Sequence, residues 1–474
     1  MSAFDFDEWL NTPGLFRTIL VEINYTLLGV PKTLHVSNAA YLSHGTDTPT
    51  YQPYDAFITS DINFKRQLSE IFTGKSRYEL TKIDLLNQEN VSDLLIAATA
   101  NHQIKILIGD NAQPLANFQV IVDALIEDVL PGKDRVIVKI KDKAKSLATP
   151  YLTDVFSSGI GEGKVIPKCL GRCFNISPVL IDDTLHVYQF NIDESQALTA
   201  ARFNGALVST SDYTVDLVNS KITFTTQPQG TVTLDVDGSK SGGTWLQTAT
   251  EMIEHLVPGA TITGLPDYLL GLYITGNRTT ANIIDEICAS VGGYWFYDRV
   301  GTYICEHFNG TSGVYDHELT DEQNIESTRL PQRKIAPVHQ ISMQYQRNFT
   351  VMSNVAEVVF DSDLALAEQL QTTGNITQRS DVSTLANYPE SLIISDVPTL
   401  IVNLIDVNTE SDRRLALRNM PHFVYQTQQL AGALTFKLGD ELLLETNGLN
   451  GHNAVITKLD ENISTGKTIV SFWQ

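Results

Sequence analysis

RTILVEINYT (residues 17–26) alternates apolar and polar side chains, and this alternation decides the fold class. Successive side chains of a β-strand point to opposite faces, so the stretch predicts a strand with one buried face. The same alternation recurs in KTLHVSN, AFITSDINFKRQLSE and HQIKILIGD, which are separated by turn residues such as Gly, Pro and Asn. The first 150 residues therefore predict a closed or strongly curved sheet.

The whole chain is expected to contain several such units. Its 474 residues are more than a single hydrophobic core usually contains. Its composition, with 42% apolar and 19% charged residues, is typical of a globular protein. The pattern predicts a mainly β, multidomain fold with an α+β insertion. We expect β-barrel domains at residues 1–150 and 335–474, a small all-β module at 151–243 and an α+β domain at 244–334.

Helix signals gather in the third unit. TWLQTATEMIEHLV places apolar residues on one face after a possible cap at Thr244, and TANIIDEICASV follows a cap at Thr279 or Thr280. Gly292 ends the second helix, and YWFYDRVGTYICEHF then predicts a hairpin. NTESDRRLALRNMP in the last unit predicts a further helix, capped by Asn408 or Thr409.

Charge and hydropathy exclude several classes of protein. The 55 acidic and 33 basic residues give a net charge of −22, which argues against a general affinity for nucleic acids or anionic membranes. No apolar run approaches the ~20 residues of a bilayer span, and MSAFDFDEWL has no basic segment before an apolar one. We expect synthesis in the cytoplasm and no stable membrane insertion.

Known catalytic motifs are missing from the sequence. TGKS at 73–76 lacks the upstream glycine of a phosphate-binding loop, and neither a His-Glu-x-x-His nor a G-x-S-x-G motif occurs. Asp182 with Asp183, and Asp361 with Asp363, are expected to be solvated turn residues. Modular β domains without clustered catalytic groups favour a structural assembly protein over an enzyme.

Four cysteines are the candidate metal ligands. Cys169 and Cys173 form a C-x₃-C pair in a predicted loop or strand end, whereas Cys288 and Cys305 are predicted to pack in the core. Four thiolates suit an iron–sulfur cluster or a structural zinc. The usual close pair is C-x₂-C, however, and the other two cysteines lie over a hundred residues away. We therefore expect no cofactor, with these four residues as the candidates if a metal is bound.

Three stretches carry a similarity to a known family. The first is VEINY with the following YLSHGTDTPTYQPYDAFITSDINFKRQLSE, HQIKILIGD and FQVIVDALIEDV. The second is GKVIPKCLGRCFNISPVLIDDTLHVYQF, and the third is LTFKLGDELLLET with AVITKLDENISTGKTIVSFW. With them the chain resembles the central hub proteins of tailed-bacteriophage baseplates and tail tips, of the long non-contractile type. In the second stretch the positions that match the family's pattern are Gly163, Pro167, Gly171, Arg172, Asn175, Pro178, Tyr188 and Gln189.

The resemblance implies a structural virion protein. Such hubs are trimers whose subunits each bring two tail-tube-like β-barrels, so that three subunits match a sixfold tail tube. It implies contacts with distal tail or tube proteins, with a tip or central fibre protein and with the tape-measure protein, in a virion tail assembled in the host cytoplasm. The hub would line a channel through which DNA passes without specific binding, and an acidic wall suits that passage. Some related tail-tip proteins hold a cluster with four cysteines, but in a cysteine-dense segment unlike this one.

Two other functions stay open at this stage. A tail-associated enzyme that degrades the cell wall would need a catalytic constellation in one cleft. A receptor-binding or glycan-binding tail protein would show a repetitive β-helical shaft or an aromatic-lined sugar site.

Overall fold

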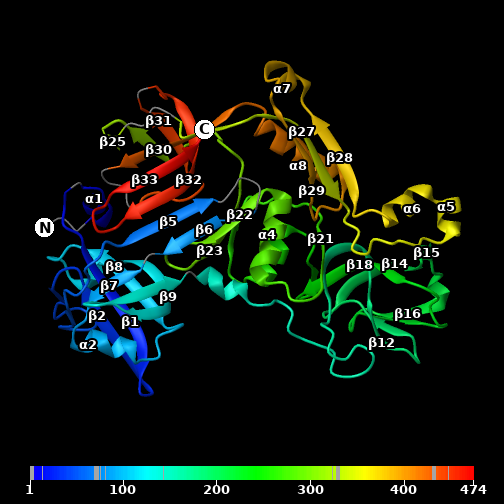
Figure 1. Cartoon of the computed structure of the whole chain (residues 1–474), viewed down its shortest axis with the longest axis horizontal. Coiled ribbons are helices and arrows are strands. Elements are labelled where there is room, and N and C mark those ends of the chain that lie inside the picture. The colour runs from blue at the N-terminus through cyan, green and yellow to red at the C-terminus, as the bar shows by residue number, and fades with distance from the viewer. Residues whose placement is uncertain are drawn as a thin grey trace.

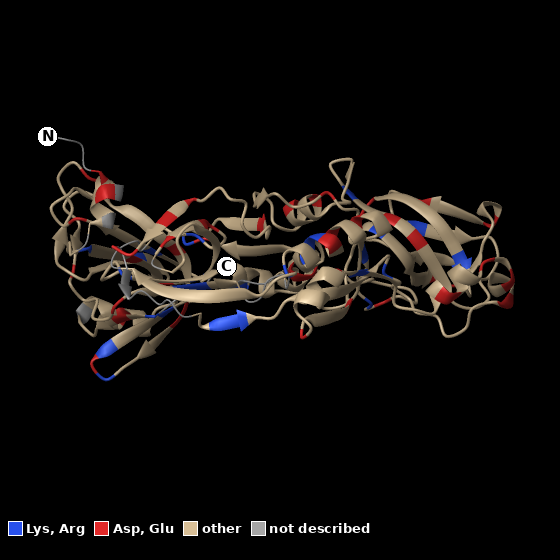
Figure 2. Ribbon diagram, turned by 90° about the horizontal axis from the view of Figure 1, so that it is seen from above, with Lys and Arg blue, Asp and Glu red and all other residues tan. Residues whose placement is uncertain are grey.

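The computed structural model describes residues 5–12, 14–68, 74, 76–80, 82–141, 143–322, 324–326, 331–429, 434–446 and 448–474. The chain is mainly β, and its two large sheets are half-barrels. Both lie at the end of the molecule where the N-terminus is found, and the smaller sheets continue toward the opposite end (Figure 1). Acidic residues are distributed along the whole length (Figure 2).

The first large sheet confirms the strands expected near the N-terminus. Each strand of this sheet is antiparallel to its neighbours. The strand order is β2 (Val30–Ser37), β1 (Thr18–Leu27), β8 (Gln103–Gly109), β9 (Gln119–Pro131), β10 (Arg135–Lys141) and β7 (Ile83–Leu86). Short elements surround it: α1 (Phe6–Asn11), β3 (Tyr41–Leu42), β4 (Pro53–Tyr54), α2 (Glu89–Ser92) and the 3₁₀ turns η1 (Asp93–Leu95), η2 (Leu115–Asn117) and η3 (Lys143–Ala148).

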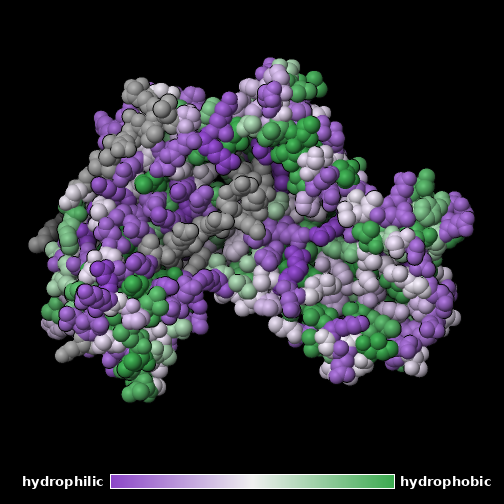
Figure 3. Space-filling view, in the orientation of Figure 1, coloured by the Kyte–Doolittle hydropathy of each residue, from purple (hydrophilic) through white to green (hydrophobic). Residues whose placement is uncertain are grey.

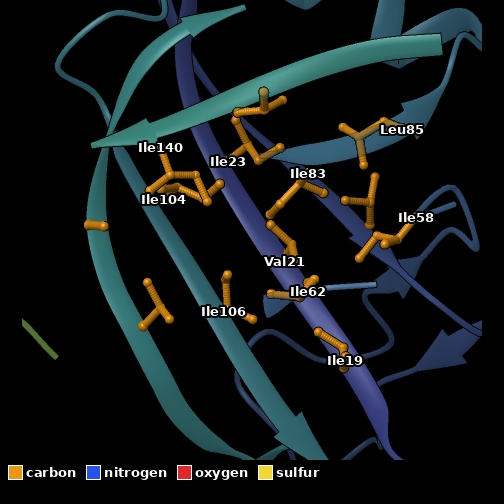
Figure 4. Close-up of a cluster of buried hydrophobic side chains, with 14 of the residues drawn as sticks. Ile19, Val21, Ile23, Ile58, Ile62, Ile83, Leu85, Ile104, Ile106 and Ile140 are labelled. Carbon is orange, nitrogen blue, oxygen red and sulfur yellow. The ribbon is translucent and has the colours of Figure 1, made fainter. Parts of the chain in front are cut away.

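The edges of this sheet are joined by the segment 55–59. Ile58 N donates to Ser37 O of β2 at 3.0 Å, and Leu86 N of β7 donates to Phe57 O at 2.8 Å. The sheet therefore curves round an apolar interior, in which Ile19, Ile83 and Ile106 are fully buried (Figure 4). Successive side chains of a strand point to opposite faces, so every second residue points to this apolar inner face.

The second large sheet comes from the C-terminal part of the chain. Its main path is β24 (His317–Thr320), β31 (Glu441–Glu445), β32 (His452–Asn462), β33 (Thr468–Trp473), β30 (His422–Gln429) and β25 (Asn324–Glu326), and β26 (Arg333–Ile335) also pairs with β30. Leu442, Ile456 and Val470 lie in its core.

One four-strand unit occurs in both large sheets. In the first sheet, β8, β9 and β10 form an antiparallel meander and the preceding strand β7 pairs with β10. In the second, β31, β32 and β33 form the meander and the preceding strand β30 pairs with β33. The register shifts between the third and fourth strands of both units, at Lys139/Ile140 and at Ile456/Lys458. The topology is therefore repeated within one chain.

A hairpin from the N-terminal part completes the second sheet. Residues Lys458 to Asn462 of β32 pair with Gln67 to Asn63 of β5 (Asn63–Leu68), which pairs in turn with β6 (Ser76–Leu80). By sequence this hairpin belongs to the unit predicted at 1–150, so the first and last predicted units share a sheet. Their boundaries stay a prediction.

The rest of the chain forms a β module and two mixed α/β layers. The module contains the sheet β15-β14-β18-β11-β21, with β19 on β18, and the sheet β12-β13-β17-β16. The strands are β11 (Lys168–Ile176), β12 (Val179–Asp182), β13 (Val187–Gln189), β14 (Ser195–Phe203), β15 (Ala206–Leu207), β16 (Tyr213–Asp216), β17 (Lys221–Phe224), β18 (Val232–Ser241), β19 (Thr244–Trp245) and β21 (Gly271–Ile274), with the turn η4 (Thr210–Asp212).

Two mixed α/β layers follow. The first has α3 (Ala249–Leu256), α4 (Thr280–Val291) and the sheet of β20 (Thr261–Thr263), β23 (Tyr303–His307) and β22 (Gly293–Tyr297). The second has the sheet of β28 (Asn375–Ser380), β27 (Val338–Tyr345) and β29 (Leu392–Val397), with α5 (Glu357–Ser362), α6 (Leu364–Leu370), α7 (Val382–Asn387) and α8 (Leu404–Ala416). Within the described ranges, no helix combines the length and apolar composition that crossing a bilayer requires.

Helix α4 confirms its prediction, whereas the starts of α3 and α8 correct theirs. The caps of α4 are Thr279 and the left-handed Gly292. Helix α3 is capped by Thr248, which forms a capping box with Glu251, because Thr244 pairs with Ser241 in a β-ladder. Helix α8 begins at Leu404, five residues before Thr409.

Candidate functional site

The stretch that carries the family pattern forms the centre of the module sheet. Strand β11 lies between β18 and β21. Gly171 has φ of +65°, and a Cβ there would lie 1.9 Å from the carbonyl oxygen of Leu270. Only glycine fits this position, because neither the conformation nor the space admits a side chain.

The other matching residues of β11 tie it to its neighbours. Arg172 donates Nε and Nη2 to the two carboxylate oxygens of Asp237, at 2.7 and 3.1 Å. Asn175 is fully buried and donates Nδ2 to Asn348 Oδ1 at 2.9 Å and to Thr350 O at 2.7 Å. Arg172 thus holds β11 to β18 within the module, and Asn175 holds the module to the chain after β27, so their role in this structure is architectural.

Cys169 and Cys173 lie in that central strand. Cys169 is its second residue, at the predicted strand end, and Cys173 lies in its interior, which corrects the loop alternative. Both are fully buried among apolar side chains such as Phe190, Ile222 and Leu234. Burial raises the pKa of the Cys169 thiol, and the adjacent Cys173 raises it further.

Cys288 and Cys305 meet in a different core. Their Sγ atoms are 3.6 Å apart, between α4 and β23, and both residues are fully buried. Burial and the neighbouring thiol raise the pKa of Cys288. The four candidate ligands thus form two separate pairs, and no group of three or more His, Cys, Asp or Glu residues in the described part of the chain is placed to hold a metal ion.

These environments predict slow thiol chemistry. The thiolate is the reactive form, and both burial and a raised pKa keep it scarce. We expect Ellman's reagent at pH 8 to react with the native chain at least about 100-fold more slowly than with the guanidinium-unfolded chain, where four thiols react. EDTA should leave the native rate unchanged. Fast release of two thiols after EDTA treatment would instead indicate a metal bound by one pair.

A buried ion cluster joins three parts of the chain. Glu461 of β32 is fully buried and accepts a hydrogen bond from Arg66 Nη2 of β5 at 2.7 Å. Arg299, between β22 and β23, lies 3.6 Å from the same carboxylate, and Leu434 N donates to it at 2.7 Å. Burial alone would raise the pKa of Glu461, but the two guanidinium groups and the hydrogen bonds lower it below its ordinary value.

A cavity of about 400 Å³ lies against the second large sheet. The strands β5, β26, β30, β32 and β33 provide most of its lining, and Phe308, Leu417 and Arg418 add to it. Its apolar part includes Trp473, whose ring stacks on His422 with 4.0 Å between ring centroids. Burial lowers the pKa of His422.

Sequence reasoning missed both the ion cluster and the cavity. Arg66 and Glu461 are 395 residues apart, and the cavity takes its lining from segments between residues 67 and 473. No local spacing signals either feature. The only available signal was the strand pattern that places Lys458 and Trp473 on strands.

Comparisons give structural neighbours but no sequence family. No family model and no curated protein matches the chain. A tail protein from Neisseria meningitidis MC58 is 9% identical, with 97% of each chain covered and a TM-score of 0.43. The 43 kDa tail protein of prophage MuSo2 from Shewanella oneidensis is 9% identical over 97% of this chain and 98% of that one, with a TM-score of 0.40.

A third similar structure belongs to a virion. A chain of the native gene transfer agent particle is 9% identical, with 68% of this chain and 86% of that chain covered, and its TM-score is 0.44. The solved structures to which this chain is similar thus include tail proteins and a virion protein.

Proposed function

We propose that the chain is a structural protein of a phage tail, the central hub of a tail tip or baseplate. It would act as a trimeric adaptor between the sixfold tail tube and a threefold tip or central fibre. The resemblance of the three sequence stretches supports this role. Its partners would be distal tail or tube proteins, the tip protein and the tape-measure protein, in the virion tail.

The repeated four-strand unit is the observation that carries the proposal. Each chain has the unit twice, in two curved sheets that the hairpin β5–β6 connects. Three copies would bring six related units to a closed ring, so a threefold object could meet a sixfold tube through similar surfaces. The two units are the barrel domains of this proposal.

The net charge suits the channel of such a ring. Like charge on the wall and on DNA keeps passing DNA from binding. Because the acidic side chains are spread over the whole molecule, a share of them would face the channel in any ring (Figure 2).

The mass of the assembled particle tests the proposal. We expect light scattering after size exclusion to give three times the chain mass of 52.4 kDa, with rings visible by electron microscopy. A trimer of this size should bury well above ~1,000 Å² per interface. A chain that remains monomeric at every concentration, or a purified protein that clears peptidoglycan, would contradict the hub.

A further inference from the structure

Every charged residue in the described lining of the cavity on the second large sheet is positive. The charged residues of this described lining are Arg333, Arg418 and Lys458, and it includes no Asp or Glu, although acidic residues outnumber basic ones by 55 to 33 in the chain. The remaining lining is amide, hydroxyl and apolar, with Leu68, Phe308 and Val424 among the apolar side chains. Such a surface fits an occupant that is acidic and apolar together.

Two of these cations have no acidic partner within the described ranges of the chain. Arg333 lies on the short strand β26 and Lys458 on β32. Neither side chain makes a hydrogen bond or ion pair with any residue that the structure describes. By contrast, Lys65 of β5 lies opposite Asp460, two residues beyond Lys458 on β32, and pairs with it at 3.2 Å. The cavity therefore has charge available for another molecule.

An acidic and apolar knob lies at the opposite end of the molecule. We define the knob as helices α5 and α6, residues 357–370, which stand out beyond the module (Figure 1). The chain has no Lys or Arg between Arg347 and Arg379, and Glu357 and Asp361 of the knob are exposed. Residues four apart lie on one face of a helix, so these two carboxylates are neighbours.

The knob has more apolar side chains than its packing against the module buries. Val359, Ala367 and Leu370 are buried against Phe174 and Met352, and this contact fixes the knob on the module. On the outside, Val358 is 59% exposed and Leu364 58% exposed, and apolar and polar residues lie side by side there (Figure 3). A surface that is both apolar and acidic complements the cavity in both respects.

We infer that the knob of a second copy of this chain docks on the second sheet and places its exposed side chains in the cavity. The inference rests on the proposed function, because it supplies the contact between neighbouring hub subunits. A chain cannot fill its own cavity, since its knob is packed on the module at the other end of the molecule (Figure 1). A contact between two different surfaces repeats from copy to copy and closes into a ring when the rotation allows it. The apolar tip of β1 and β2, around Leu28 and Val30, is a poorer occupant because its segment, residues 24–33, contains Lys32 and no Asp or Glu.

Charge reversal tests the contact in the full-length chain. The cavity variant carries Arg333→Glu with Lys458→Glu, and the knob variant carries Glu357→Lys with Asp361→Lys. We expect each variant to weaken trimer formation by at least about tenfold in mass photometry, because like charges then meet at the contact. The chain with all four substitutions should recover to within about threefold of wild type. The control Glu162→Lys with Asp183→Lys, on other exposed acidic residues, should leave assembly unchanged.

Cross-linking gives a second readout that does not depend on charge. All four natural cysteines are buried, so engineered thiols at Phe360 and Val424 would be the accessible ones. We expect a bismaleimide to join chains that carry Phe360→Cys with Val424→Cys, and not chains with either substitution alone. Suppose that the wild type is a trimer, that neither charge variant weakens assembly, and that the double-cysteine chain gives no cross-link. That result would overturn this inference while leaving the hub intact. A wild-type monomer would overturn the hub itself.

Discussion

Replacing Glu461 by alanine is expected to lower the free energy of unfolding by about 3–5 kcal/mol. The carboxylate is fully buried between Arg66 and Arg299, and its removal leaves two guanidinium groups without the charge that compensates them. Arg66 is itself 2% exposed, so water cannot replace the lost partner. Since the cluster joins β5, β32 and the turn after β22, the loss should separate the hairpin from the second sheet.

Urea unfolding followed by circular dichroism measures this effect. The matched control is Asp460→Ala on the adjacent residue, whose ion pair with Lys65 is partly exposed and should contribute below about 1 kcal/mol. The pKa of Glu461 is lowered in the folded chain, so its contribution is present above the ordinary pKa of about 4.3 and disappears as the pH falls through the folded value. The difference between wild type and variant should therefore shrink in acid. Equal effects of the two substitutions at neutral pH would contradict the account.

Glu410→Ala, in another part of the molecule, should lower the free energy of unfolding by a similar amount, about 3–5 kcal/mol. Glu410 is fully buried on α8 and accepts hydrogen bonds from Arg413 Nη2 at 2.7 Å and Arg414 Nε at 2.6 Å. Arg414 also donates to the carbonyl oxygen of Ala289 at 2.6 Å, near the end of α4. The substitution would leave Arg414, which is 3% exposed, without its counter-charge between two helices.

Asp412→Ala provides the matched control within the same helix. Asp412 binds Arg379 through two hydrogen bonds of 2.8 and 2.6 Å, but both side chains are about half exposed, and such pairs contribute about 1 kcal/mol or less. Thermal unfolding of the two variants should separate them clearly. If Glu410→Ala is no worse than Asp412→Ala, the buried cluster on α8 does not stabilise the fold in the way proposed.

Elements with local signals were predictable from the sequence. The alternation in RTILVEINYT gave β1 because strand faces follow from side-chain order alone. Helix α4 begins and ends as predicted, because Thr279 and Gly292 act within one turn of the helix they terminate.

Positions with competing partners were not predictable. The predicted start of α8 was wrong because Asn408 and Thr409 look like capping residues. Inside the helix, however, the Thr409 hydroxyl donates to the carbonyl oxygen of Ile405, and Asn408 Oδ1 accepts from the Thr377 hydroxyl. Cys169 and Cys173 were predicted in a loop or at a strand end because Gly171 lies between them, but that glycine allows the close approach of Leu270 to a central strand. The cavity and the Glu461 cluster depend on pairings across several hundred residues, which spacing cannot reveal.

The pairing of β5 with β32 has a consequence for how the chain is made. A ribosome completes β5 long before β32, since Arg66 and Glu461 are 395 residues apart. At ~5–20 residues per second the hairpin waits roughly 20–80 s for its partner strand. During that time its free edge is open to other nascent chains, so the speed of translation and the presence of chaperones should decide how much of this protein matures.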